Sequence, residues 1–384
     1  MGTFRRAGVI MAAAAAPIAL AYRFALAYRV RAGYPRRSAP RITPDALGLP
    51  FETLTVHSDG LELPAWFIPA HDGAPGPGIV LVHGWESGRD RTLPMAVFLH
   101  AAGFHCLTFD VRGHGTNPPE EHPISAGEFG ADTLAAFRTL LARPEVTVGG
   151  VSGHSMGGIG AILAAGADPR VGVLISSSSP ADPYRLTRQT FRLARLPIPD
   201  PIAYPLAWLT TRVYVRPRGH VVADIDASQA IARYRGPILL AHGAEDAVVP
   251  PSHLERLAAA ARAGREPGDP PVETLLVSGG QHSWLYELPE YRRAVARSAA
   301  AALGGPLSAE AAGEVAAATH AERIPDGEAR FAATEDVHSG ARTLVRVVLP
   351  GATRRIRIDG DAPDGADGHL KADADTVSAG TADA

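Results

Sequence analysis

Apolar residues are grouped into short runs from Phe51 onward, and helical patterns separate most of these runs. Two runs, residues 51–58 and 61–69, flank Asp59-Gly60 and predict a pair of strands joined by a tight turn. Six further runs are apolar almost throughout and have the length of strands; they cover residues 78–84, 104–110, 146–153, 171–179, 236–243 and 272–280. Runs of this kind are typical of strands that are buried on both faces of a sheet.

Helical spacing of apolar residues fills most of the intervals between these strands. The predicted helices cover residues 93–102, 126–142, 159–167, 252–263 and 289–303. Strands that alternate with helices pack as a parallel sheet with helices on both faces. The pattern therefore predicts the α/β class, as a three-layer α/β/α sandwich around a mostly parallel sheet.

One interval, residues 180–236, is much longer than the others and is rich in Arg, Tyr, Trp and Pro. Residues 184–196 and 202–215 within it have helical patterns. Long insertions are usually functional or separately folded, so we interpret this one as a helical cap over the sheet edge. The alternative is a two-helix insertion without contact to any site. Its arginines could favour an acidic substrate or lie on solvated helix faces; they are Arg185, Arg188, Arg192 and Arg195.

The first 30 residues form an apolar segment in which Gly8–Tyr22 carries no charge. A bilayer core needs about 20 apolar residues, a length reached here only by continuing past Arg23 to Tyr28. We predict a membrane anchor formed by residues 7–28, with a cleaved signal peptide and a soluble alanine-rich helix as alternatives. Arginines are more frequent after this segment than before it, which favours a cytoplasmic location of the following domain over an exported one.

Composition divides the rest of the chain into three parts. Proline-rich residues 31–50 are expected to link the apolar segment to a folded domain at residues 51–306. From residue 307 the chain becomes small and acidic and has few large apolar groups. Residues 307–384 are therefore expected to be a largely disordered tail.

Charge and cysteine content exclude several classes of function. The net charge of the 384 residues is −3, and no basic, aromatic-interleaved face is present, so nucleic acid is not an expected partner. The single cysteine, Cys106, permits no intrachain disulfide and argues against a cysteine-based metal site. It lies in the apolar run FHCLTF and is interpreted as a buried structural thiol.

Glycines surround one serine in the stretch GVSGHSMGGIG, residues 150–160. Gly153, Ser155 and Gly157 fit the pattern G-x-S-x-G, which here follows an apolar strand and precedes a helix-forming segment. In such a turn the serine has strained backbone geometry, and a residue larger than glycine would clash with the neighbouring elements. The helix N-terminus that follows points its amides at developing negative charge. This context predicts that Ser155 is a nucleophile rather than an incidental serine of a flexible turn.

A serine is a poor nucleophile unless a base activates it and a third group orients that base. Among the histidines after the next-to-last predicted strand, His282 directly follows the last strand, at the same sheet end as Ser155. We predict His282 as the base. The acid is expected after the preceding strand, where Glu245 and Asp246 are adjacent; we favour Asp246, since the turn that it closes leads into the next helix.

Two backbone amides are expected to bind the oxyanion of the reaction. The first is the amide of Met156, directly after the nucleophile. The second is the amide of Trp85, in the loop where His83-Gly84 lets the backbone approach the site closely. His83 itself is interpreted as a structural residue of its loop. Neither a metal ion nor an organic cofactor is expected.

Together these motifs resemble those of serine hydrolases with the α/β-hydrolase fold. The matching features are His83-Gly84, DVRGHG from Asp110, GHSMGG at the serine, HGAEDAVVP at the acid, and His282, in the family's order of serine, acid and histidine. DVRGHG and HGAEDAVVP are similar to the prolyl-oligopeptidase-like, dienelactone-hydrolase-like and esterase branches. The resemblance implies an eight-stranded, mostly parallel sheet and assigns the nucleophile, acid and base to Ser155, Asp246 and His282.

The expected reaction is cleavage of a carboxylic ester or related acyl bond through an acyl-enzyme intermediate. Its partner would be a small-molecule ester, amide or thioester. A serine peptidase and an acyltransferase or thioesterase would use the same residues and remain as alternatives. A non-catalytic binding protein on this fold is a further alternative, although such proteins usually lack part of the three-residue set.

Overall fold

One sheet of eight strands forms the centre of the protein, in a computed structural model that describes residues 2–70 and 73–324. The strands are β1 (Glu52–Ser58), β2 (Leu61–Ile68), β3 (Gly76–Val82), β4 (His105–Phe109), β5 (Val146–His154), β6 (Val171–Ser177), β7 (Ile238–Gly243) and β8 (Val272–Val277). Their order across the sheet is β1-β2-β4-β3-β5-β6-β7-β8. Strand β2 pairs antiparallel with β1 and β4, and all other neighbours are parallel. The predicted mostly parallel, eight-stranded sheet is confirmed.

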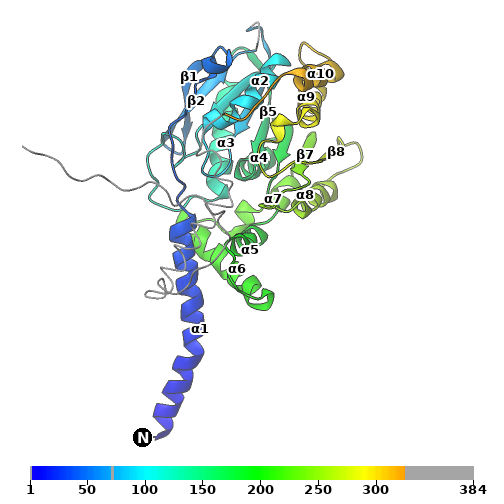
Figure 1. The fold of residues 1–384 in the computed structure, drawn as a ribbon. Helices are drawn as coiled ribbons and strands as arrows, with labels where there is room; N and C mark the ends of the chain where they lie inside the picture. The colour runs from blue at the N-terminus through cyan, green and yellow to red at the C-terminus, as the bar shows by residue number, and fades with distance from the viewer. Residues whose placement is uncertain (1, 71–72, 325–384) are drawn as a thin grey trace, which may run out of the picture.

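Helices cover both faces of the sheet and bury a separate apolar cluster on each (Figure 1). One face packs against α3 (Ala126–Leu141), α4 (Met156–Ala167), α7 (Ala227–Ile231) and α8 (Ser252–Ala263). The other packs against α2 (Leu93–Ala101), α9 (Pro289–Leu303) and α10 (Ala309–Ala318). The prediction of a three-layer α/β/α sandwich is therefore confirmed.

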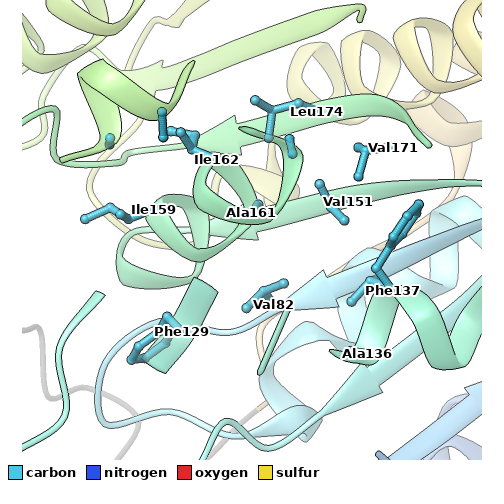
Figure 2. Close-up of a cluster of buried hydrophobic side chains, with 14 of the residues drawn as sticks. Val82, Phe129, Ala136, Phe137, Val151, Ile159, Ala161, Ile162, Val171 and Leu174 are labelled. Carbon is cyan, nitrogen blue, oxygen red and sulfur yellow. The ribbon is translucent and has the colours of Figure 1, made fainter. Parts of the chain in front are cut away.

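The cluster beneath α3 and α4 holds the junction between β5 and α4 in place. Phe137 of α3, Val151 of β5 and Leu174 of β6 are all fully buried there (Figure 2). Ile159 and Ile162 fix the first turns of α4 in the same cluster. Burial of each such side chain stabilises the fold by roughly 1.5–3 kcal/mol, so this junction has a rigid support.

The insertion after β6 contains two helices, α5 (Pro183–Leu193) and α6 (Asp200–Val215), as predicted. The Asp182 side chain caps α5 by accepting a hydrogen bond from the Arg185 amide at 2.8 Å. The hydroxyls of Thr187 and Thr211 join the two helices at 2.9 Å. These helices make the insertion a compact cap. Short 3-10 helices complete the fold: η1 (Pro44–Leu47), η2 (Arg89–Thr92), η3 (Arg216–Arg218), η4 (Val222–Ile225) and η5 (Leu285–Glu287).

His253, in the first turn of α8, holds the chain where it enters the cap. Its Nδ1 accepts a hydrogen bond from the Ala181 amide at 2.9 Å, so the ring is buried in its neutral form. Burial, reinforced by the positive charges of nearby side chains, lowers the pKa of His253 to about 4. The unfolded chain binds this proton near pH 6.5, whereas the folded protein binds it only near pH 4, so acid favours unfolding between these values.

We expect His253→Gln to weaken the pH dependence of stability. The glutamine amide oxygen can still accept the hydrogen bond from Ala181, but it binds no proton. The fall in the free energy of unfolding between pH 7 and pH 5 should therefore be about 2 kcal/mol smaller than in the parent protein. Urea unfolding of both proteins at the two pH values measures this difference. An unchanged fall would contradict a neutral, buried His253.

A helix of 31 residues, α1 (Gly2–Ala32), forms the amino-terminal part of the structure. In the described part of the chain, no helix combines the length and apolar character needed to cross a bilayer. The predicted membrane anchor at residues 7–28, and the membrane-associated localisation derived from it, are therefore wrong. The uncharged stretch between Arg6 and Arg23 is residues 7–22, which is 16 residues, against the roughly 20 that a bilayer core requires. The cytoplasmic location of the domain was inferred from that anchor and loses its basis.

The carboxy-terminal half of α1 instead packs against the cap (Figure 1). Phe24 and Tyr28 contact the ring of Phe191 edge-on, at centroid distances of 5.4 and 5.8 Å. The Tyr28 hydroxyl lies 2.9 Å from that of Thr190, and the Tyr214 hydroxyl donates to the Ala32 carbonyl at 3.0 Å. The end of α1 is thus a third helix of the cap, a role that its sequence alone did not predict.

The segments on either side of the folded domain make more contacts with it than predicted. In the predicted linker at residues 31–50, Leu49 is buried and Arg37 donates to the Asn117 carbonyl at 2.6 Å. The disordered tail predicted from residue 307 is wrong for its first part, because α10 packs on α9 and fully buries Ala312 and Ala316. The rest of that predicted tail, residues 325–384, lies outside the described residues.

Candidate active site

The turn between β5 and α4 holds Ser155 in a strained conformation. Its φ is +55° and its ψ is −118°, a region that non-glycine residues rarely adopt. The Ser155 amide donates to the Ser177 carbonyl of β6 at 2.9 Å, which fixes the turn against the neighbouring strand. The hydroxyl is therefore presented at the carboxyl end of the sheet, in the conformation expected for a sharp strand-to-helix turn.

The two glycines of the motif lie where the backbone segments nearly touch. A Cβ atom on Gly153 would lie 2.2 Å from the Gly157 carbonyl oxygen. A Cβ atom on Gly157 would lie 2.3 Å from the His83 carbonyl oxygen. Since these neighbours are backbone atoms, they cannot move aside as a flexible side chain could. Glycine at both positions allows β5, α4 and the loop after β3 to approach each other.

Three side chains from different loops form one hydrogen-bonded series at this end of the sheet. His282, in the loop after β8, places its Nε2 3.1 Å from the Ser155 Oγ. Its Nδ1 lies 2.8 Å from Oδ2 of Asp246, in the loop after β7. The structure thus brings together the three residues that the sequence pattern selected, whereas the neighbouring Glu245 is exposed to solvent.

Asp246 is buried and accepts hydrogen bonds from several directions. Its Oδ1 accepts from the amides of Val248 and Val249 at 2.9 and 2.7 Å, and its Oδ2 lies 3.2 Å from Nε2 of His242. Burial alone would raise the pKa of Asp246, but the hydrogen bonds from His242, His282 and the Val249 amide outweigh it and hold the pKa below its ordinary value. The carboxylate is therefore ionised and can only accept.

This ionised carboxylate determines which nitrogen of His282 carries the proton. Because Asp246 can only accept, the Nδ1 of His282 must donate to it. The Nε2 of the neutral ring then has a free lone pair, and it faces the Ser155 hydroxyl. The arrangement leaves Nε2 ready to take a proton from Ser155.

Two histidines that the sequence pattern did not single out support this series. His154 precedes the serine, and its Nε2 donates to the His282 carbonyl at 2.6 Å, with the two ring centroids 5.0 Å apart. Burial, with the nearby His282, lowers the pKa of His154 to about 4, so its ring is neutral near pH 7. His242, four residues before Asp246, also donates from its Nε2 to the Val249 carbonyl at 2.8 Å. In the sequence, these histidines are marked only by lying next to the serine and acid motifs. The fold is needed to show which groups their rings contact.

The loop after β3 brings a second backbone segment to the serine. His83 Nδ1 donates to the Gly84 carbonyl at 2.7 Å, and its Nε2 accepts from the Val111 amide at 3.0 Å. Both ring nitrogens are thus engaged within the fold, which suits the structural role expected for His83. A Cβ atom on Gly84 would lie 3.5 Å from the Ser155 Cβ, so the chain passes close to the serine immediately before Trp85.

Met156 directly follows Ser155, and Trp85 directly follows Gly84, the residue that approaches the serine. Met156 is the first residue of α4, and the first amides of a helix have no partner within it. The positive end of the helix dipole lies at the same position. The Trp85 side chain stacks on Phe129 of α3 at a centroid distance of 6.4 Å, which restrains the backbone that carries its amide.

A cavity of about 700 Å³ opens onto these groups. Ser155, His282, Trp85 and Met156 all line it. Part of its wall comes from the cap and from the end of α1, so the insertion contributes directly to the cavity. The wall residues include Tyr28, Leu186, Phe191, Leu193, Tyr214 and Val215. A volume of this size suits a small-molecule ligand.

The cap arginines singled out in the sequence do not line this cavity. Arg185 pairs with Asp182 at 3.0 Å, and Arg188 and Arg192 pair with Asp200. These ion pairs stabilise the insertion internally. The expectation that the cap arginines favour an acidic substrate is therefore not supported.

The described residues contain no group of three or more His, Cys, Asp or Glu side chains arranged to hold a metal ion.

Comparisons with known proteins agree with this architecture. The sequence model of the alpha/beta hydrolase family matches residues 79–298. An uncharacterized protein of Mycobacterium tuberculosis is 28% identical over 231 residues, which cover 59% of this chain and 71% of that protein. An esterase of Pyrococcus furiosus superposes with a TM-score of 0.52 at 20% identity, over 65% of this chain and 88% of the esterase. A puromycin-hydrolyzing peptidase of Mycobacterium tuberculosis has a TM-score of 0.51 at 19% identity, over 67% of this chain and 40% of the peptidase. At these identities the two solved structures show a shared fold.

Proposed function

Because this chain belongs to the alpha/beta hydrolase family and is a hydrolase, we propose that it cleaves carboxylic esters or related acyl bonds through an acyl-enzyme at Ser155. The observation that supports this proposal most strongly is the hydrogen-bonded series from Asp246 through His282 to Ser155. With His282 in its neutral form, the series supplies what the chemistry requires: an ionised acid, a base whose Nε2 lone pair faces the serine, and a hydroxyl.

In the acylation step the Ser155 Oγ attacks the substrate carbonyl carbon while its proton passes to Nε2 of His282. The carbonyl oxygen becomes an oxyanion, and the amides of Met156 and Trp85 donate to it. The tetrahedral intermediate then collapses and breaks the bond to the alcohol, which leaves with the proton from Nε2. Asp246 stabilises the imidazolium that exists between these two proton transfers.

Deacylation repeats the same steps with water. His282 removes a proton from a water molecule, whose oxygen attacks the acyl carbon, and the same two amides bind the second oxyanion. Collapse releases the carboxylic acid and returns the proton from Nε2 to the Ser155 Oγ. The strained turn at Ser155 keeps its hydroxyl fixed throughout, so little reorganisation is needed during turnover.

A peptidase and a thioesterase or acyltransferase would use the same series, and the apolar cavity favours small esters over peptides. The part of its wall that the cap contributes is rich in aromatic and aliphatic residues, which suit the apolar chain of a small ester better than an extended, polar peptide backbone. The fold comparisons include both an esterase and a peptidase and do not discriminate.

A panel of matched substrates tests the proposal. The purified chain should hydrolyse p-nitrophenyl octanoate with a kcat/KM at least 100-fold above that for the octanoyl anilide, and above that for the octanoyl thioester. We expect this order because ester cleavage needs no protonation of a poor amine leaving group. Faster cleavage of the anilide would identify a peptidase or amidase instead, and absence of all three activities would contradict a hydrolase of acyl bonds.

A further inference from the structure

The charge of the cavity lining is strongly asymmetric. Among the described residues that line it, one is a carboxylate, Glu86, and five are arginines: Arg31, Arg36, Arg37, Arg41 and Arg91. Four of the five come from the end of α1 and the segment after it, and Arg91 comes from η2. Positive charge therefore lies along one wall of a cavity whose other walls are largely apolar.

This segment lies along the loop that carries the proposed oxyanion donor. The Arg36 amide donates to Oε1 of Glu86 at 3.2 Å, and Glu86 directly follows Trp85. The Arg41 amide donates to Oδ2 of Asp90 at 3.1 Å. Two backbone hydrogen bonds thus hold the arginine-bearing segment beside the site, so that its charge acts on whatever occupies the cavity.

Arg31 and Arg37 carry charge that the described residues do not neutralise. Arg31 is half-buried in the last turn of α1, and it forms no ion pair with a carboxylate in the described part of the chain. Arg37 gives one hydrogen bond from Nη1 to the carbonyl of Asn117, which is uncharged. For the half-buried Arg31, partial removal from water without an anionic partner is unfavourable, and a bound anion would offset that penalty, whereas the exposed Arg37 adds a second donor group at the same wall. Its planar donors match the oxygens of a carboxylate or phosphate.

We infer that the cavity accepts an ester that combines an apolar chain with an anionic oxyacid group, a carboxylate or a phosphate, at the arginine-lined wall. The apolar chain contacts the cap side chains such as Leu186 and Phe191, while the anion contacts Arg31 and Arg37. This inference rests on the proposed function at Ser155, and it names the substrate class of that site. The arginines bind substrate and take no part in bond cleavage.

Three p-nitrophenyl esters of equal chain length test the inference. They are the monoester of suberic acid, with a free carboxylate, the same ester with that carboxylate methylated, and 8-phosphonooxyoctanoate. The scissile bond is the same in all three, and rates are normalised to hydroxide-catalysed hydrolysis. We expect kcat/KM for at least one of the two acidic esters to exceed that for the neutral ester by about tenfold or more, mainly through a lower KM. The comparison of the two acidic esters identifies which oxyacid the wall prefers.

Two variants and a matched control assign the preference to named residues. Arg31→Met and Arg37→Met should each reduce the acidic-to-neutral ratio of kcat/KM about fivefold to tenfold, since each removes a charge-assisted contact. Arg29→Met changes an arginine in the same turn of α1 that does not line the cavity, and it should leave the ratio unchanged. Thermal unfolding of each variant shows whether the helix still packs on the cap.

The outcomes separate this inference from the proposed function. If the neutral ester is cleaved as well as both acidic esters, the inference is overturned while the hydrolase proposal stands. The inference is also overturned if Arg31→Met and Arg37→Met keep the parent ratio. If no ester is cleaved, the hydrolase proposal fails. Calorimetric titration with suberate and octyl phosphate then tests, without any reaction, whether the arginine-lined wall binds an anion. Binding that Arg31→Met weakens about tenfold would support the anionic subsite, and absence of binding would overturn it.

Discussion

Replacing Ser155 with alanine is expected to reduce kcat for ester hydrolysis by a factor of about 10⁵ to 10⁶. On the proposed mechanism the variant loses the atom that forms the acyl-enzyme, while the amides of Met156 and Trp85 and the cavity remain. Its residual rate should therefore still exceed that of the reaction in water, by roughly 10³-fold. Initial rates with p-nitrophenyl octanoate at saturating substrate, at high enzyme concentration, measure both quantities.

Ser152→Ala provides the matched control for this prediction. Ser152 lies on β5, three residues before Ser155, is buried, and has a hydroxyl without a hydrogen-bond partner in the described part of the chain. Its loss should change kcat less than about threefold. A Ser155→Ala protein that keeps more than a tenth of the parent rate would rule out Ser155 as the nucleophile.

Asp246→Asn should reduce kcat about 10⁴-fold without unfolding the protein. The buried carboxylate holds His282 with its proton on Nδ1, whereas an asparagine can present its amide group as a donor to that nitrogen. His282 would then carry its proton on Nε2 and could not take one from Ser155. The measurement is kcat at pH 7, with circular dichroism to check that the fold is retained.

Glu245→Gln is the control for the Asp246 prediction, because it removes the adjacent carboxylate. Glu245 is exposed, whereas Asp246 accepts four hydrogen bonds or ion-pair contacts inside the fold. The control should retain at least about half of the parent activity. If the two variants lost activity equally, the choice of Asp246 as the acid would have to be abandoned.

Much of the fold and the candidate site could be predicted from local sequence patterns. Apolar runs and helical spacing report burial directly, so every predicted strand and core helix is present in the sheet and its two covering layers. The site residues follow strand ends, and parallel strands bring their carboxyl ends to one edge. Ser155, Asp246 and His282 therefore meet, although 36 residues separate the last two and 127 separate the serine from the histidine.

What could not be predicted depends on contacts between distant segments. The apolar side chains of α1 are equally compatible with a lipid environment and with the surface of another helix, and only the fold shows Tyr28 against Phe191. The sequence offered only the cap arginines as side chains that could favour an acidic substrate, whereas the arginines that line the cavity come from the end of α1, the segment after it and η2. An arginine pairs with the carboxylate that lies close to it in three dimensions. Local sequence patterns do not report this proximity, so they do not show which arginines form ion pairs.

The most direct test of the proposed chemistry is covalent labelling with a fluorophosphonate, followed by mass spectrometry of the intact protein and its peptides. The reagent phosphonylates an activated serine, and we predict one label per chain, located on Ser155 and absent from Ser155→Ala. Denaturing the protein first should abolish labelling, because the reactivity depends on His282 and Asp246. Absence of labelling of the native protein, or a label on another residue that persists in Ser155→Ala, would contradict the assignment of Ser155 as the nucleophile.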